Sequence, residues 1–149
     1  MKTFKLIGMV LLALTMSMSF ASCSDDDDPE SNVNYLIGSW ESTWDKGYEI
    51  NTDSEGKEVR KDFDEASSGY FVTFKKDGTG YDYEEGFEND RDNFTWSLKG
   101  DKLYMNYSFD EGVGIVKELS KNTLKIYAEE EEDGKVVWAN LSTYKKISK

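Results

Sequence analysis

The chain can perform little side-chain chemistry, because it contains one cysteine, Cys23, and no histidine. Histidine acid–base catalysis, serine–histidine triads and metal sites built on histidine or cysteine are therefore excluded. Paired carboxylates could hydrolyse a glycoside, but among 30 acidic residues some pair will always fall at a workable separation. No Gly-rich loop opens a helix, so phosphate binding has no support. We expect a non-enzymatic protein with no metal and no cofactor.

Cys23 lies at the end of a segment that is typical of an export signal. Two lysines near the N-terminus precede apolar or small residues at 6–20, a stretch shorter than the roughly 20 residues that span a bilayer. The run Ser19-Phe20-Ala21-Ser22-Cys23 resembles a lipobox, in which a cysteine is joined to diacylglycerol before the signal is removed. The resemblance implies a signal peptide at 1–22 and a membrane anchor on Cys23. The alternative is an ordinary signal peptide with an accidental cysteine.

The residues after Cys23 form an acidic run at Asp25 to Asp28, followed by Pro29 and further polar residues. Such a segment cannot bury itself, so we expect an extended, disordered tether over 23–34. The run also resembles the acidic tag that directs lipoproteins to the outer face of the outer membrane in some Gram-negative bacteria. That resemblance implies a cell-surface location. The negative formal charge, −12 for the whole chain, would repel phosphate backbones and anionic lipid headgroups, so no nucleic acid partner is expected.

Acidic clusters also occur at 84–92 and 129–133. Loop carboxylates can gather calcium, but these clusters and the run after Cys23 lack the alternating spacing that ends in a bidentate glutamate. We interpret them as solvated loops and tether, with calcium binding as the alternative.

From Tyr35 onward, apolar and polar residues alternate with period two, which is typical of strands with one buried face. Turn sequences such as Lys76-Asp77-Gly78 and Asp133-Gly134 would join antiparallel neighbours. Residues 51–69 are charged, and we expect a long loop or an extra hairpin there at one mouth. The predicted strands span residues 39–50, 70–75, 79–85, 93–98, 102–109, 113–119, 123–130 and 135–147.

Eight such strands can hide their apolar faces by closing into a barrel, which also removes exposed edges. The sequence therefore predicts an all-β fold, an eight-stranded antiparallel up-and-down barrel over 35–149, after the signal peptide and the flexible acidic tether.

Gly38-Ser39-Trp40 resembles the Gly-x-Trp signature of lipocalins. With the hairpin from Phe74 to Gly80 and the closing Tyr144-Lys145-Lys146-Ile147, the chain resembles small lipocalin-like lipoproteins that bacteria export. The resemblance implies structural roles for Gly38 and Trp40. Trp40 would close the barrel floor under a basic side chain, Lys145 or Lys146.

Aromatic residues make up 14% of the chain and are the remaining candidates for ligand contact. We expect Trp44 and Tyr48 to continue the face of Trp40. The alternative is that the aromatic side chains simply fill the barrel, which at eight strands holds packed side chains or one small ligand. The candidate ligand-lining residues are Trp44, Tyr48, Tyr81, Tyr83, Trp96, Met105 and Tyr107.

Two functions are compatible with this sequence. The first is a surface-anchored lipocalin-like module that binds a small hydrophobic or glycan-like ligand in or at the mouth of its barrel. The second is an accessory envelope protein with a solid core, which contacts a protein partner through its outer face. An inner cavity of a few hundred Å³ would favour the first, and a filled core beside an exposed apolar patch would favour the second. Hydrolysis by two carboxylates is a third alternative.

Overall fold

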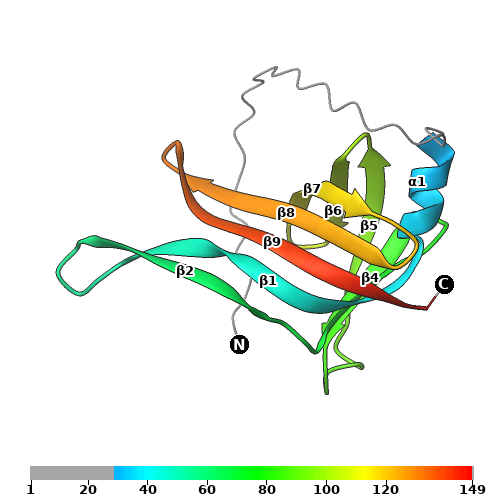
Figure 1. Cartoon of the computed structure of the whole chain (residues 1–149), viewed down its shortest axis with the longest axis horizontal. Helices are drawn as coiled ribbons and strands as arrows, with labels where there is room; N and C mark the ends of the chain where they lie inside the picture. The colour runs from blue at the N-terminus through cyan, green and yellow to red at the C-terminus, as the bar shows by residue number, and fades with distance from the viewer. Residues whose placement is uncertain (1–28, 149) are drawn as a thin grey trace.

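The computed structural model describes residues 29–148, so the predicted signal peptide, Cys23 and the aspartate run lie outside the described residues. The described part contains one short helix followed by nine antiparallel strands (Figure 1). The elements are α1 (Pro29–Leu36), β1 (Gly38–Thr52), β2 (Glu58–Ala66), β3 (Tyr70–Phe74), β4 (Thr79–Glu84), β5 (Asp92–Lys99), β6 (Lys102–Tyr107), β7 (Glu111–Leu119), β8 (Thr123–Glu132) and β9 (Lys135–Ser148).

The strands close into the predicted eight-stranded barrel. Neighbours in sequence from β3 to β9 pair in space, β1 pairs with β3, and β1 also pairs with β9 to complete the ring. The register between β1 and β9 runs from Ser39 opposite Ser148 to Glu49 opposite Trp138. The all-β, up-and-down barrel expected from the alternation is therefore confirmed.

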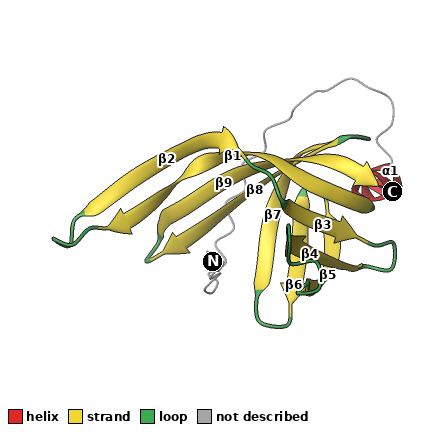
Figure 2. Ribbon diagram, turned by 90° about the horizontal axis from the view of Figure 1, so that it is seen from below, coloured by secondary structure: helices red, strands yellow, loops and turns green. Residues whose placement is uncertain are grey.

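The ninth strand, β2, lies within residues 51–69, for which the sequence predicted either a long loop or an extra hairpin. β2 pairs with the second half of β1, from Trp44 opposite Ala66 to Thr52 opposite Glu58, while β3 pairs with the first half. The two strands thus occupy one edge of β1 in succession. Figure 2 shows the β1–β2 and β8–β9 hairpins extending together beyond the rest of the barrel. The hairpin alternative was correct.

Helix α1 corrects the expected boundary of the tether. Residues 29–34 were predicted to be extended, but they form the first turns of α1. A proline suits the start of a helix because its missing N–H would have no helical partner there. At the other end, Leu36 is fully buried and its carbonyl oxygen accepts a hydrogen bond of 2.8 Å from Trp40 Nε1. Packing on the barrel therefore holds a segment whose polarity alone suggested extension.

Trp40 closes one end of the barrel, which we call the base. Its side chain is completely buried among apolar side chains from α1 and the surrounding strands. The ammonium group of Lys146 lies 4.6 Å from its ring centroid, whereas Lys145 pairs with Glu41 at 2.9 Å. The basic side chain over the floor is therefore Lys146. The other buried apolar residues of this core are Leu36, Val72, Phe74, Phe94, Trp96, Leu103 and Leu124.

The predicted turn at Lys76-Asp77-Gly78 is formed as expected. Gly78 adopts a φ of 81°, a left-handed conformation that glycine tolerates best. The Asp77 carboxylate accepts hydrogen bonds from the Thr79 amide at 3.0 Å and the Thr79 hydroxyl at 2.6 Å. These bonds lower the pKa of Asp77. Such local bonds explain why short polar sequences marked the strand ends reliably.

Candidate functional site

The barrel interior changes from apolar to polar on the side of the core away from the base. Asp82, at the centre of this polar layer, points inward from β4 and is only 6% exposed. The hydroxyl of Tyr107 on β6 donates to Asp82 Oδ2 at 2.5 Å, and the Tyr70 hydroxyl on β3 also bonds to this carboxylate. Two strands besides its own therefore position one buried acid.

Burial shifts the pKa of Asp82 and of the tyrosines that surround it. Burial raises the pKa of Asp82, and the hydrogen bonds from Tyr107 and Tyr70 only partly offset that rise. Burial likewise raises the pKa of Tyr107 and Tyr70 well above the usual range, and the pKa of Tyr144 to about 12. The tyrosines therefore stay protonated at neutral pH and act as hydrogen-bond donors.

A second polar group lies on the neighbouring strands β1 and β9. The amide nitrogen of Asn140 donates to Asp45 Oδ1 and to Ser142 Oγ, both at 3.0 Å. Ser142 Oγ donates to Asp45 Oδ1 at 2.7 Å. The other Asn140 side-chain atom, Oδ1, is buried without a hydrogen-bond partner. An unpaired buried acceptor is costly, so a donor brought by a ligand or a water would be favourable at this point.

The open end of the barrel, which we call the mouth, combines an exposed aromatic ring with acidic side chains. Phe109, in the turn after β6, is 66% exposed and stacks on Tyr107 with ring centroids 5.4 Å apart. Burial and the carboxylates of Glu132 and Asp110 raise the pKa of Glu130, so negative charges from different strands meet here. The mouth therefore presents an aromatic surface surrounded by carboxylates.

Three of the seven candidate ligand-lining residues pack in the interior. Trp96 belongs to the base core, and its Nε1 donates to the carbonyl oxygens of Thr79 at 2.9 Å and Lys75 at 3.2 Å. Met105 and Tyr107 are half-buried against the same core. Of these three, Tyr107 reaches the polar layer. Their role in contacting a ligand stays a prediction.

Tyr81 and Tyr83 were expected inside, but they lie on the outer face. Strand β4 places Gly80 and Asp82 inward, since these residues pair with Phe94 and Val72, which are core residues. A Cβ at Gly80 would lie 2.3 Å from the Phe94 ring, so only glycine fits there. Outside, Tyr83 stacks between Phe71 and Tyr81, and both tyrosines lie under the guanidinium of Arg91.

Trp44 and Tyr48 also lie outside, because β1 contains an irregularity that the alternation did not reveal. Its register with β9 shifts between Ser42 and Trp44, which is the mark of a β-bulge. One extra residue moves every following side chain to the opposite face. Trp44 is consequently 45% exposed and donates to Asp64 Oδ1 at 2.7 Å. The ring of Tyr48 lies 3.7 Å below the guanidinium of Arg60.

Two cavities stand out among residues 29–148, and both lie outside the barrel. The larger, about 480 Å³, lies at the base and is lined by residues of α1 and of nearby turns. The smaller, about 370 Å³, lies on the β1–β2 hairpin beside Tyr48 and Arg60. Both are open concavities on the outer surface, so neither supplies the inner cavity that would favour a ligand inside the barrel.

Within residues 29–148, no group of acidic side chains is arranged to hold a metal ion. The same part of the chain has no helix long and apolar enough to cross a membrane.

Comparison with known proteins places this fold. No curated protein matches the chain. Two solved structures are similar: a lipocalin-like protein from Bacteroides uniformis, at 17% identity over 76% of this chain and 99% of that one, and an uncharacterized protein from Bacteroides eggerthii, at 13% identity over 75% and 99%. Both give a TM-score of 0.49. The family described as Lipocalin-like domain matches residues 36–126. Because this match covers more than half of the chain, the protein belongs to the family of lipocalin-like domains.

Proposed function

We propose that the protein is a non-enzymatic, surface-anchored binding module that holds a small polyhydroxylated ligand, such as a sugar, at the mouth of its barrel. The observation that carries this proposal is the exposed Phe109 ring beside the carboxylates of the mouth. A lipocalin-like barrel supports ligand binding in general, and the carboxylates favour a ligand with hydroxyl donors.

The chemistry of the mouth selects against other ligand classes. Phe109 offers an exposed ring face for the apolar side of a sugar, while the carboxylates around Glu130 offer acceptors for hydroxyl groups. Anionic ligands would be repelled by the carboxylates around Glu130. A wholly hydrophobic ligand would remove water from the carboxylates of the mouth without replacing their hydrogen bonds, which disfavours it.

Binding can be tested by native mass spectrometry of the purified protein, followed by calorimetric titration with a panel of neutral mono- and disaccharides. Replacing Phe109 by alanine should weaken the best binder at least about tenfold, because an aromatic anchor is lost. Tyr35→Ala removes another exposed aromatic ring, 42% exposed and at the opposite end of the barrel, and should leave affinity unchanged. Equal losses in both variants, or no binder in the panel, would contradict the mouth site.

The alternative of a protein partner is favoured by one observation on the outer face. Phe71, Tyr81 and Tyr83 form a half-buried aromatic cluster beneath Arg91. Aromatic residues and arginine are the side chains that most often anchor protein interfaces. If the saccharide titrations fail, this cluster becomes the stronger candidate.

Anchoring is proposed through lipidation of Cys23 in an outer-membrane lipoprotein at the cell surface. Two acyl chains suffice for stable attachment, since each buried methylene contributes about 0.8 kcal/mol. Cys23→Ser should therefore shift the protein out of the membrane fraction and abolish labelling by a clickable palmitate analogue. Ser22→Ala changes the neighbouring residue and should preserve both. Continued acyl labelling of Cys23→Ser would contradict the anchor.

A further inference from the structure

The two ends of the barrel carry opposite charge. The up-and-down order places the turns after β3, β5 and β7 at the base, beside α1 and the C-terminal end of β9. Asp77 and Asp101 are the acidic residues within these three turns, and Glu118 lies at the edge of the third. The lysines in these turns, at their edges or at the end of β9 are Lys75, Lys76, Lys99, Lys102, Lys121 and Lys146. In a chain of net charge −12, this local excess of positive charge is unexpected.

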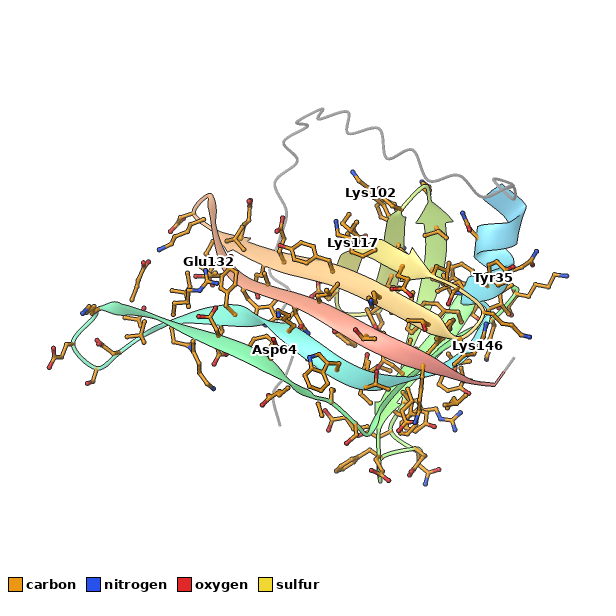
Figure 3. The ribbon with its side chains drawn as sticks, in the orientation of Figure 1. Tyr35, Asp64, Lys102, Lys117, Glu132 and Lys146 are labelled. Carbon is orange, nitrogen blue, oxygen red and sulfur yellow. The ribbon has the colours of Figure 1, made fainter. Side chains whose placement is uncertain are left out.

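The mouth has the reverse composition. Its turns follow β1, β4, β6 and β8, and the cations of these turns and the adjoining strand ends are Lys57, Arg60, Lys61, Arg91 and Lys135. The acidic residues of these turns and the adjoining strand ends are Asp53, Glu55, Glu58, Glu84, Glu85, Glu88, Asp90, Asp92, Asp110, Glu111, Glu129 to Glu132 and Asp133. In Figure 3, Tyr35 and Lys146 lie beside α1 and Glu132 lies on the far β8–β9 hairpin.

The base also has a built concavity. Lys76, Lys121 and Lys146 line the cavity of about 480 Å³ together with Tyr35 and Ile37. The ammonium of Lys146 donates to the Tyr35 carbonyl oxygen at 2.5 Å, which ties the end of β9 to α1. Lys76 and Lys121, beside an aromatic and an aliphatic side chain, suit a phosphate group carried by an apolar body.

The chain enters the folded domain at this same end. Cys23 is separated from Pro29, the first residue of α1, by a segment that can span at most about 20 Å in any conformation. If Cys23 carries the proposed anchor, the base is the end held near the lipid. Tyr35 and Ile147, 42% and 47% exposed, add apolar surface there.

From these observations we propose that the base of the barrel is a membrane-facing surface that binds anionic lipid headgroups. The acidic mouth is then repelled by the same membrane and points away from it, open to ligands from outside. This orientation rests on the proposed anchor at Cys23 and does not depend on what the mouth binds.

Acetylation footprinting tests the orientation. The full chain, in the form that the cell processes, is mixed with phosphatidylcholine vesicles with or without phosphatidylglycerol, treated with an amine-acetylating reagent and analysed by mass spectrometry. We expect acetylation of Lys76, Lys102 and Lys121 to fall several-fold on anionic vesicles. Lys57 and Lys135, at the mouth, should react at their solution rates. Equal protection at both ends, or protection of the mouth lysines alone, would overturn the proposal.

Charge reversal provides a matched control. Lys76→Glu with Lys121→Glu should abolish the protection of Lys102, whereas Lys57→Glu with Lys135→Glu changes net charge equally and should preserve it. Loss of protection in both double variants would show that only the net charge of the protein matters, and would refute a specific lipid-binding surface at the base. Flotation with neutral vesicles reports the anchor separately. A protein that floats with neither vesicle type would refute both proposals. One that floats only with anionic vesicles would refute the anchor and the orientation that rests on it, and would leave headgroup binding by the base.

Discussion

Replacing Trp40 by alanine is expected to lower the free energy of unfolding by about 4 kcal/mol. The indole is completely buried, so its removal leaves a large cavity in the base core. It also removes the donor to the Leu36 carbonyl oxygen, which ties α1 to the barrel. Urea unfolding followed by far-ultraviolet circular dichroism would measure the loss.

Trp44 is the matched control, because it has the same side chain four residues along the same strand but is 45% exposed. Trp44→Ala should cost about 0.5 kcal/mol or less, as is usual for surface positions. Trp40→Phe keeps a ring in the core and loses mainly the Nε1 bond, at about 1 kcal/mol, so it remains measurable if the alanine variant does not fold. A loss at Trp40 no greater than at Trp44 would refute its role as the floor of the barrel.

The same pair of tryptophans explains how far the sequence could predict the fold. Period-two alternation and polar turns are local signals, and they located β1 and β3 to β9, including the closed turn at Asp77. Faces along a strand, however, depend on an unbroken count of residues. The bulge between Ser42 and Trp44 adds one residue to that count, and no single residue type announces it. Trp44 was therefore assigned to the wrong face although its strand was correct.

The inward face of strand β4 was predicted wrongly for a different reason. Its sequence, Thr-Gly-Tyr-Asp-Tyr-Glu, offers two faces, and hydrophobicity favours burying the tyrosines. The neighbouring strands decide otherwise, because the Phe94 ring needs the space that Gly80 leaves. Asp82 is consequently forced inside, where Tyr107 and Tyr70 satisfy it. Such a choice depends on residues far apart in sequence, so it became visible only when the strands were paired.

The sequence did not predict the polar layer of the candidate site for the same reason, because the inward face of a strand depends on distant residues. Asp82 and Asn140 are polar residues in strands whose inward positions were expected to be apolar or aromatic. A search restricted to aromatic side chains could find Tyr107 but not its acidic partner. Polar residues at inward positions are the signal that could have located this group, since burying them costs free energy that needs a compensating role or partner.

Tyr107→Phe should lower the free energy of unfolding by about 2 kcal/mol at pH 7, because it leaves the buried Asp82 carboxyl without its 2.5 Å donor. The loss should shrink in acid, where Asp82 is protonated and needs that donor less. Urea unfolding at pH 7 and at about pH 3.5, below the ordinary aspartate pKa, would compare the two states. Tyr104→Phe removes a hydroxyl from the opposite face of β6 and should cost little at either pH.

The raised pKa of Asp82 predicts the direction in which stability changes with pH, which packing alone would not predict. The pKa is higher in the folded protein than in the unfolded chain, so the folded state binds the proton more readily. The contribution of Asp82 to stability must then decrease as pH rises from the unfolded pKa through the folded one. Asp82→Asn removes this charge, and its stability relative to the parent protein should increase with pH across that window. A Tyr107→Phe loss that is equal at both pH values, or an Asp82→Asn difference independent of pH, would mean that the carboxylate is not buried and ionised as described.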